Sequence, residues 1–200
     1  MALPSERAVL TRDAIVAAAR EVIATSGLEA LSLRRLATGL GVTAPALYAH
    51  VTDKEDLLRA LATAEFDALV ARFAAVDEDD PVARIRAHGR AYVAHARESP
   101  ELFHVMFLFP PDLGAADLPE GRELPGATQA FAAAFGAVED AAASGALAID
   151  DPLLAALTLW SAMHGVATVL QLGLDLPSEV EDALIDEATD RILAGYRPSV

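Results

Sequence analysis

The most informative stretch of this chain is SLRRLATGLGVTAPALYAHVTDKEDLL, residues 32–58. Leucines recur in its first half at helical spacing, and Gly41 then supplies a turn. Thr43 can cap a second helix, and Pro45 is tolerated in the first turn of that helix because its missing N–H would have no intrahelical partner. Two short helices that meet at a tight turn are the layout of a helix-turn-helix, whose second helix enters the DNA major groove.

The same stretch resembles the tetracycline-repressor (TetR) family of bacterial transcription factors. The signature of that family is a leucine–tyrosine pair, a histidine two residues after the tyrosine, and a lysine four residues further on. The matching positions here are Leu47, Tyr48, His50 and Lys54. Val51 departs from the pattern, since most members carry phenylalanine at this place. The resemblance covers Thr11 to about Leu61 and implies a DNA-binding transcriptional regulator.

The rest of the chain also has helical periodicity, and no alternating β pattern of any length occurs. We therefore predict an all-α fold: a three-helix, helix-turn-helix DNA-binding domain at 1–55 and a larger helical ligand-binding and dimerisation domain at 76–200. A fourth helix, over about 53–75, links the two. The other predicted helices cover residues 11–26, 81–97, 100–109, 127–144, 151–173 and 178–195, with a proline-rich loop over 110–126.

The charge is unevenly distributed. The net charge is −15, yet residues 1–55 hold six basic and six acidic side chains, a balance of zero, so the later residues carry the whole excess. DNA binding requires a local basic patch against phosphates, not a basic protein overall. The acidic remainder can repel DNA and favour one docking orientation, or it can simply keep the protein soluble.

Several other classes of protein are disfavoured. The chain has no cysteine, which excludes disulfides and thiolate zinc sites. Its five histidines lack metalloprotease-like spacing, and no phosphate-binding glycine loop occurs, so we predict no metal, no cofactor and no enzymatic activity. The amino terminus lacks an apolar segment behind a basic start, so we expect a cytoplasmic protein.

The segment Leu153–Leu174 contains no charged residue over 22 positions, which is long enough to span a bilayer. Its flanks are acidic, whereas membrane helices usually have basic cytoplasmic flanks. Small and weakly polar residues also recur along it at three- and four-residue spacing, namely at Thr158, Ser161, Gly165 and Thr168. We predict a buried helix and no membrane span.

The resemblance implies that Thr43–His50 lies in the major groove. Thr43 can offer its hydroxyl to a phosphate or a base, whereas Ala44, Pro45 and Ala46 can only meet thymine methyl groups. Arg34 is then the strongest candidate for a bidentate contact to guanine, with a solvated or phosphate-bound arginine as the alternative. Arg35 could make the same contact or reach a phosphate.

Phosphate contacts are expected on both sides of the motif. Tyr48 and His50 resemble the phosphate donors of the family, although Tyr48 could instead pack between helices. Lys54 begins the fourth helix, where free N–H groups already favour an anion, so we expect it to bind a phosphate rather than to be an ordinary surface lysine. Thr11 or Arg12 is a further candidate.

The segment LWSAMHGVA resembles family effector-binding domains in which tryptophan and a His-Gly pair recur. An apolar, aromatic lining suits a lipophilic ligand. The candidate lining residues are Tyr92, Phe103, Met106, Phe107, Phe131, Phe135, Trp160, Met163 and His164. Each of them could instead be ordinary core, and His164 could be a buried histidine with its hydrogen bonds satisfied.

The resemblance also implies a homodimer in which the last two helices pair with their copies. The stripe of small residues over 158–168 agrees with this, as does a face formed by Val180, Leu184, Ala188 and Ile192. The predicted function is a repressor that a small lipophilic ligand of unknown identity releases from an inverted-repeat DNA operator. The alternative is a ligand-independent DNA-binding or scaffolding protein with no effector pocket.

Overall fold

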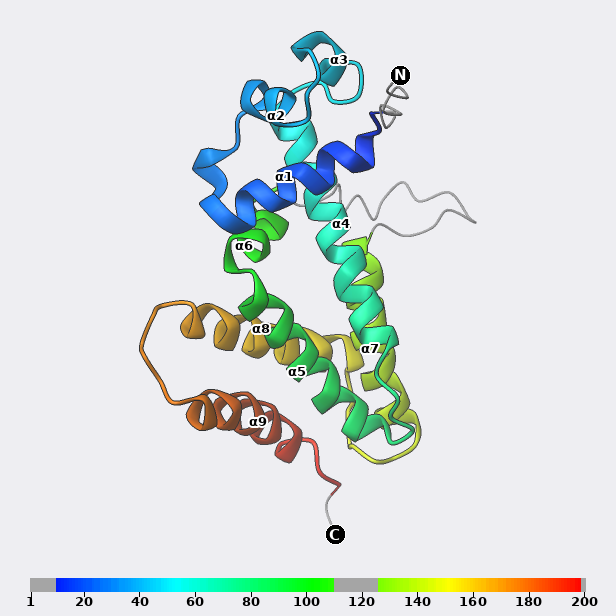
Figure 1. Cartoon of the computed structure of the whole chain (residues 1–200). Coiled ribbons are helices and arrows are strands. Elements are labelled where there is room, and N and C mark those ends of the chain that lie inside the picture. Colours follow the sequence, from blue (N-terminus) through cyan, green and yellow to red (C-terminus); the bar gives the residue numbers. More distant parts are fainter. Residues whose placement is uncertain (1–9, 110–125, 199–200) are drawn as a thin grey trace, which may run out of the picture.

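The computed structural model describes residues 10–109 and 126–198, whose regular structure is entirely helical (Figure 1). The elements are α1 (Arg12–Ser26), a short 3₁₀ turn η1 (Leu28–Ala30), α2 (Leu33–Gly39), α3 (Ala44–Tyr48), α4 (Lys54–Ala74), α5 (Pro81–Glu98), α6 (Pro100–Leu108), α7 (Gly126–Ala143), α8 (Pro152–Leu170) and α9 (Ser178–Ala194). The prediction of an all-α fold is confirmed. Most of the predicted loop at 110–126 lies outside the described residues.

Side-chain capping explains where α1, α4, α5 and α8 begin. The Thr11 side chain accepts a hydrogen bond from the Ala14 N–H at 3.1 Å, and Asp53 accepts one from the Asp56 N–H at 2.8 Å. Asp80 and Asp151 cap α5 and α8 in the same way, each directly before a proline. These contacts satisfy N–H groups that have no intrahelical partner.

The N-terminal core, formed by α1–α3, also takes side chains from α4 and α6. Its fully buried members include Ile15, Ile23 and Leu47 from the first three helices. Leu57, Leu58, Leu61 and Ala62 come from α4, and Leu102 and Val105 come from α6. The leucines and valines of the motif differ in burial. Leu36 and Val51 are buried, whereas Leu33, Leu40 and Val42 are only partly buried.

The longest helix, α4, connects the two halves of the molecule (Figure 1). Its first half lies in the N-terminal core, and its second half packs Phe66, Leu69 and Phe73 against α5 and α7. Both halves bury apolar side chains, so a shift of α4 at one end disturbs packing at the other.

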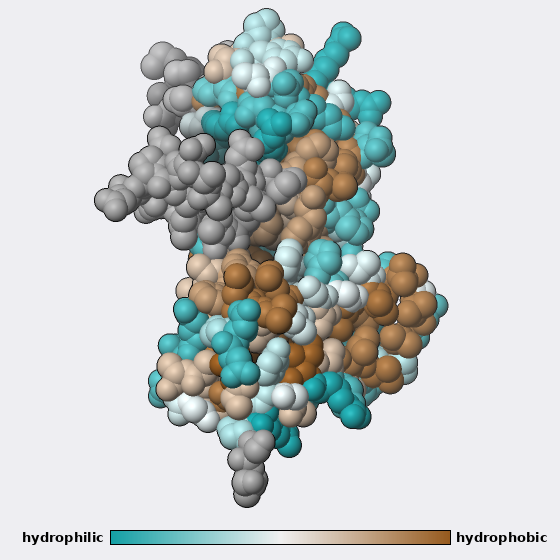
Figure 2. Space-filling view, turned by 180° about the vertical axis from the view of Figure 1, so that it is seen from behind, coloured by the Kyte–Doolittle hydropathy of each residue, from teal (hydrophilic) through white to brown (hydrophobic). Residues whose placement is uncertain are grey.

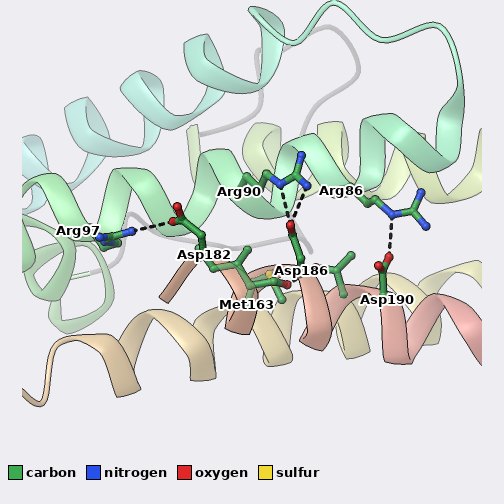
Figure 3. A network of polar contacts seen from close by, with 9 residues as sticks. Arg86, Arg90, Arg97, Met163, Asp182, Asp186 and Asp190 are labelled. Atoms are coloured by element: carbon green, nitrogen blue, oxygen red, sulfur yellow. Dashed lines mark hydrogen bonds and ion pairs between the residues drawn. The ribbon is translucent and has the colours of Figure 1, made fainter. Parts of the chain in front are cut away.

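A ladder of ion pairs joins α5 to α9 along the surface (Figure 3). The pairs are Arg86–Asp190 at 2.7 Å, Arg90–Asp186 at 2.8 Å and Arg97–Asp182 at 3.5 Å, and Arg97 also pairs with Glu181. Their spacing follows the turns of two antiparallel helices. The pair with Arg90 lowers the pKa of Asp186.

Beneath this ladder, Gly89 allows α5 to approach the two last helices closely. A Cβ atom at Gly89 would lie 3.1 Å from Met163 Sδ and 3.5 Å from Thr189 Oγ1. Any larger residue there would have to displace a buried side chain of α8 or α9. The position of α9 thus depends on both the ion pairs and this close contact.

The prediction of a buried helix is correct for only one face of α8. That face packs Ala155, Leu159 and Met163 into the core. The opposite face exposes Leu154, which is 59% exposed. Among the described residues, α8 is the one helix whose length and composition would suffice to cross a membrane, and 33% of it is buried. Seen from behind, hydrophobic surface gathers over the lower half of the molecule (Figure 2).

Arg12 ties the start of α1 to the start of α4. Its guanidinium donates to both carboxylate oxygens of Asp56, at 2.6 and 3.2 Å, and to the His50 carbonyl oxygen at 2.6 Å. The hydrogen bond from Arg12 lowers the pKa of Asp56 from 3.8 to about 2, with help from the Thr52 N–H.

We predict that Asp56→Asn destabilises the protein at neutral pH by about 0.5–1 kcal/mol, the size expected for a partly exposed ion pair. Since the folded-state pKa is depressed, the stabilisation is present above 3.8 and is lost as the pH falls towards about 2. Urea unfolding at several pH values measures the difference. Asp67→Asn, at an exposed site on the same helix, should show no such difference. An unchanged advantage of the parent protein at pH 2 would contradict the assignment.

Candidate functional sites

The surface of α3 is exposed and carries no charged side chain. Leu47, fully buried, anchors the helix in the N-terminal core, while Pro45, Ala46 and Tyr48 face solvent. The Thr43 side chain caps the helix by accepting from the Ala46 N–H at 3.4 Å. Gly41 makes the preceding turn at a φ of +67°. This surface can form apolar contacts and can hydrogen-bond through the Thr43 and Tyr48 hydroxyls, but it can form no bidentate contact to a base.

Two exposed arginines lie at the start of α2, where Arg34 and Arg35 follow Ser32. Both guanidinium groups are available for bidentate hydrogen bonds to a guanine edge or to phosphate. The structure describes no ion pair for either of them.

The remaining predicted contact residues have intramolecular partners. Arg12 forms an ion pair with Asp56, and the backbone carbonyl of the half-buried His50 accepts a hydrogen bond from the same arginine. The Lys54 ammonium lies 3.4 Å from the Leu28 carbonyl oxygen, to which it donates. Ala44 is half-buried, and Thr11 is exposed and caps α1.

A cavity of about 350 Å³ lies between the helices of the C-terminal half. Its walls come from the second half of α4 and from α5 to α9, and they are almost entirely apolar. Two of its lining residues, Leu157 and Trp160, are 38% and 40% exposed, so the cavity approaches the surface beside α8. A volume of this size and character suits a small lipophilic molecule.

The cavity contains five of the nine side chains that the sequence suggested for it. These are Tyr92, Phe107, Phe131, Trp160 and Met163. Phe103 and Met106 lie instead in the buried core beside the cavity, and Phe135 packs in the cluster around Val138. His164 is not in the wall, and it stays beside Tyr92.

A hydrogen-bonded chain of side chains stiffens one wall. The Trp160 indole N–H donates to the Tyr92 hydroxyl at 3.2 Å, and that hydroxyl lies 2.9 Å from His164 Nδ1. Burial raises the pKa of Tyr92, and burial lowers the pKa of His164. The phenol is therefore the donor to a neutral imidazole, and both polar atoms are satisfied within the protein.

Sequence reasoning missed the contribution of α4 and most of α5. The missed lining residues are Phe66, Leu69, Phe73, Ile85, His88, Gly89, Ala130, Ala134, Val138, Ala156, Leu157, Leu159 and Thr189. One signal was present, because Phe66, Leu69 and Phe73 recur at three- and four-residue spacing along one helix face. The sequence could not indicate the small lining residues, because an alanine lines a cavity only where the neighbouring helix is too distant to pack against it.

Groups of three or more side chains able to hold a metal ion are absent from the described residues. His88 and His95 share α5, and both are buried. Burial lowers the pKa of each imidazole.

Two family models match the chain. Residues 15–61 match the bacterial regulatory proteins of the tetR family, and residues 85–192 match the tetracyclin repressor-like C-terminal domain. The first region contains α2 and α3 with most of α1, and the second contains α6 to α8 with most of α5 and α9.

Two known proteins resemble the chain over nearly its whole length, and a third resembles it over about a quarter. An uncharacterised HTH-type transcriptional regulator of Mycobacterium tuberculosis is 31% identical over 94% of this chain and 82% of its own. The class C tetracycline repressor of Escherichia coli is 49% identical over 28% of this chain and 25% of its own. A solved structure from Rhodococcus sp. RHA1, of unknown function, superposes with a TM-score of 0.80 at 27% identity, over 98% of this chain and 100% of its own.

The matches cover both halves of the chain, and they agree with the exposed helix-turn-helix and the helical domain around a cavity. The family consists of transcriptional regulators and not of enzymes. This chain therefore belongs to the TetR family of DNA-binding transcriptional regulators.

Proposed function

We propose that this regulator is a repressor, which binds an inverted-repeat operator as a homodimer and leaves it when a small lipophilic molecule occupies the cavity. The observation that supports the proposal is that α4 and α6 each belong both to the N-terminal core and to the cavity wall. Both helices contribute side chains to the N-terminal core, and both line the cavity. With chromosomal DNA as its target, the protein acts in the cytoplasm.

The DNA contact is proposed to centre on α3. Its exposed Pro45 and Ala46 would meet thymine methyl groups, and Thr43 would donate to a phosphate or a base. Arg34 on α2 would supply the bidentate contact that α3 lacks, while Tyr48 and Lys54 would bind phosphates. Lys54 would exchange the Leu28 carbonyl for a phosphate oxygen, which is a stronger partner for an ammonium.

Dimerisation is proposed through the outer faces of α8 and α9. The outer face of α8 carries a stripe of small side chains between exposed leucines, and a helix with such a face is usually covered by another chain. A single small helix reads DNA weakly, so a second copy is needed to contact the other half-site.

The coupling between cavity and DNA is proposed to run through α6 as well as α4. Phe107 lines the cavity, whereas Leu102 and Val105, on the same helix, are buried in the N-terminal core. A ligand that displaces Phe107 would therefore press on the packing of the DNA-contacting helices. It weakens DNA binding only as far as it prefers the displaced conformation.

The alternative function, a ligand-independent DNA-binding or scaffolding protein, requires no internal space. The cavity favours the effector-controlled function, because closely packed interiors seldom leave an apolar void of this size.

The experiment that tests the proposal is selection of DNA from a random duplex library by the purified protein. We expect an inverted repeat with two half-sites, whose centre-to-centre spacing reflects the dimer. A folded dimer that enriches no sequence would contradict the proposed operator binding. The selected DNA then becomes the probe for the variants below.

We predict that Lys54→Ala weakens binding about equally for all DNA sequences and lowers the salt slope by about one unit, because one phosphate contact is lost. Arg34→Ala should instead relax the preference at one base pair, by roughly 1–3 kcal/mol. Fluorescence anisotropy over a salt series, with a panel of single-base operator variants, separates the two effects. Arg72→Ala, at the C-terminal end of α4 and away from both proposed interfaces, is the control and should change neither. Wild-type behaviour of both test variants would exclude this docking geometry.

We predict that Gly165→Arg converts the protein into a monomer with an intact fold. A Cβ atom at Gly165 meets nothing within 4 Å in the single chain, so only a partner on α8 would be displaced. Sedimentation equilibrium measures the mass, and circular dichroism checks the fold. The control is Gly136→Arg on α7, where a Cβ atom also meets nothing and the dimer should persist. A dimeric Gly165→Arg protein would place the interface elsewhere.

We predict that Ala134→Phe, which fills part of the cavity, abolishes release by lipophilic compounds while operator affinity stays within about threefold of the parent (~0.6 kcal/mol). Ala132→Phe adds the same ring to an exposed position on α7 and should leave release unchanged. Anisotropy of labelled operator, titrated with compounds found by thermal-shift screening, gives both readouts. Equal release from the two variants would show that the effector binds outside this cavity.

A further inference from the structure

His88 is the exception in the apolar wall of the cavity. It lies on α5, is 7% exposed, and stacks its ring on Phe73 with the ring centroids 4.6 Å apart. Its Nδ1 atom is buried and has no hydrogen-bond partner among the described residues. Native proteins rarely leave a buried polar atom unpaired, because the unmet group costs about 1–3 kcal/mol.

The other polar side chains of the wall are already satisfied. The Tyr92 hydroxyl lies between Trp160 and His164. The Thr189 hydroxyl donates to the Ile185 carbonyl oxygen at 3.0 Å. Among the described lining residues, His88 Nδ1 is therefore the one buried side-chain polar atom without any hydrogen-bond partner.

The protonation state of His88 determines what it can bind. Burial lowers the pKa of the imidazole, Arg84 adds to the effect, and a hydrogen bond to the Phe73 backbone opposes it. The ring is therefore neutral at pH 7, with its proton on the nitrogen that faces that backbone. Nδ1 is left with a lone pair and acts as an acceptor.

The absence of charged side chains from the cavity wall further restricts the chemical class of the ligand. The lining contains no Lys, Arg, Asp or Glu, and Arg84, whose charge reaches His88, already pairs with Asp140 at 3.0 Å, so neither a carboxylate nor an ammonium group would find a free counter-charge there. Burying such an ion without a partner is strongly unfavourable. A neutral ligand avoids this cost.

We propose that His88 Nδ1 is the polar anchor of the cavity and that the effector is an uncharged, largely apolar molecule with a hydroxyl or N–H group directed at it. This inference rests on the proposed function, in which the cavity holds the effector. The inference adds the chemical class of the ligand, which the shape and the apolar lining of the cavity do not determine by themselves.

The test uses Trp160, the single tryptophan of the chain, which lines the cavity and reports occupancy by its fluorescence. The full-length protein is titrated with 1-decanol, decyl methyl ether and decanoate, which share a chain but differ in donor and charge. We expect the alcohol to bind about fivefold tighter than the ether, the value of one net hydrogen bond. Decanoate at pH 7 should bind more weakly than the alcohol.

Two variants assign the preference to His88. His88→Phe keeps a ring against Phe73 but removes the acceptor, so the alcohol-to-ether ratio should fall to about one. Thr189→Val removes a hydroxyl of the wall that already donates its proton but could still accept one, and it should keep the parent ratio because the proposed acceptor is His88 Nδ1.

Every other result of these titrations would contradict a specific part of the proposal. Equal binding of alcohol and ether by the parent protein, tighter binding of decanoate, or a ratio that survives in His88→Phe would refute the anchor while leaving an apolar effector site. Binding of none of the three probes would refute the anchor and would also count against the proposed lipophilic effector. The parent titrations decide the anchor even if His88→Phe does not fold.

Discussion

The constraint on which the rest of the structure depends is that α4 is buried at both ends in different cores. Leu57 and Leu61 complete the packing of α1–α3, and Phe66 and Phe73 form part of the cavity wall. A helix transmits displacement along its axis because its backbone hydrogen bonds are retained when it tilts. Neither core can therefore rearrange without an effect on the other, and α6 makes a second connection through Leu102 and Phe107.

The distribution of polar contacts follows the same division. Arg12 and Asp56 fix the N-terminal helices to the start of α4, while the Arg–Asp ladder fixes α9 to α5. Both sets of pairs are partly exposed, so each contributes little energy and serves mainly to set the register of neighbouring helices. Burial of apolar side chains supplies most of the stability, since all three hydrophobic clusters consist of aliphatic and aromatic side chains.

The acidic character of the chain agrees with this arrangement. Many carboxylates of the C-terminal half pair with arginines on the surface, and none lines the cavity. The interior of that half is left neutral, which suits an uncharged ligand. Near the proposed DNA contact, Arg34 and Arg35 remain exposed without an ion pair among the described residues, so the local positive charge does not depend on the net charge of the protein.

The sequence by itself determined the helices and the DNA-contacting motif, because both depend on local chemistry. Thr11, Asp53 and Asp80 cap the N–H groups of their own helices, and the signature around Tyr48 lies within one short segment. Only the tertiary structure decided which apolar side chains border empty space. Phe107 lines the cavity whereas Met106, its neighbour on α6, is fully buried in the core, and periodicity cannot separate them. The same holds for the exposed face of α8 and for His88, because both depend on where the neighbouring helices lie and not on the residues beside them in the chain.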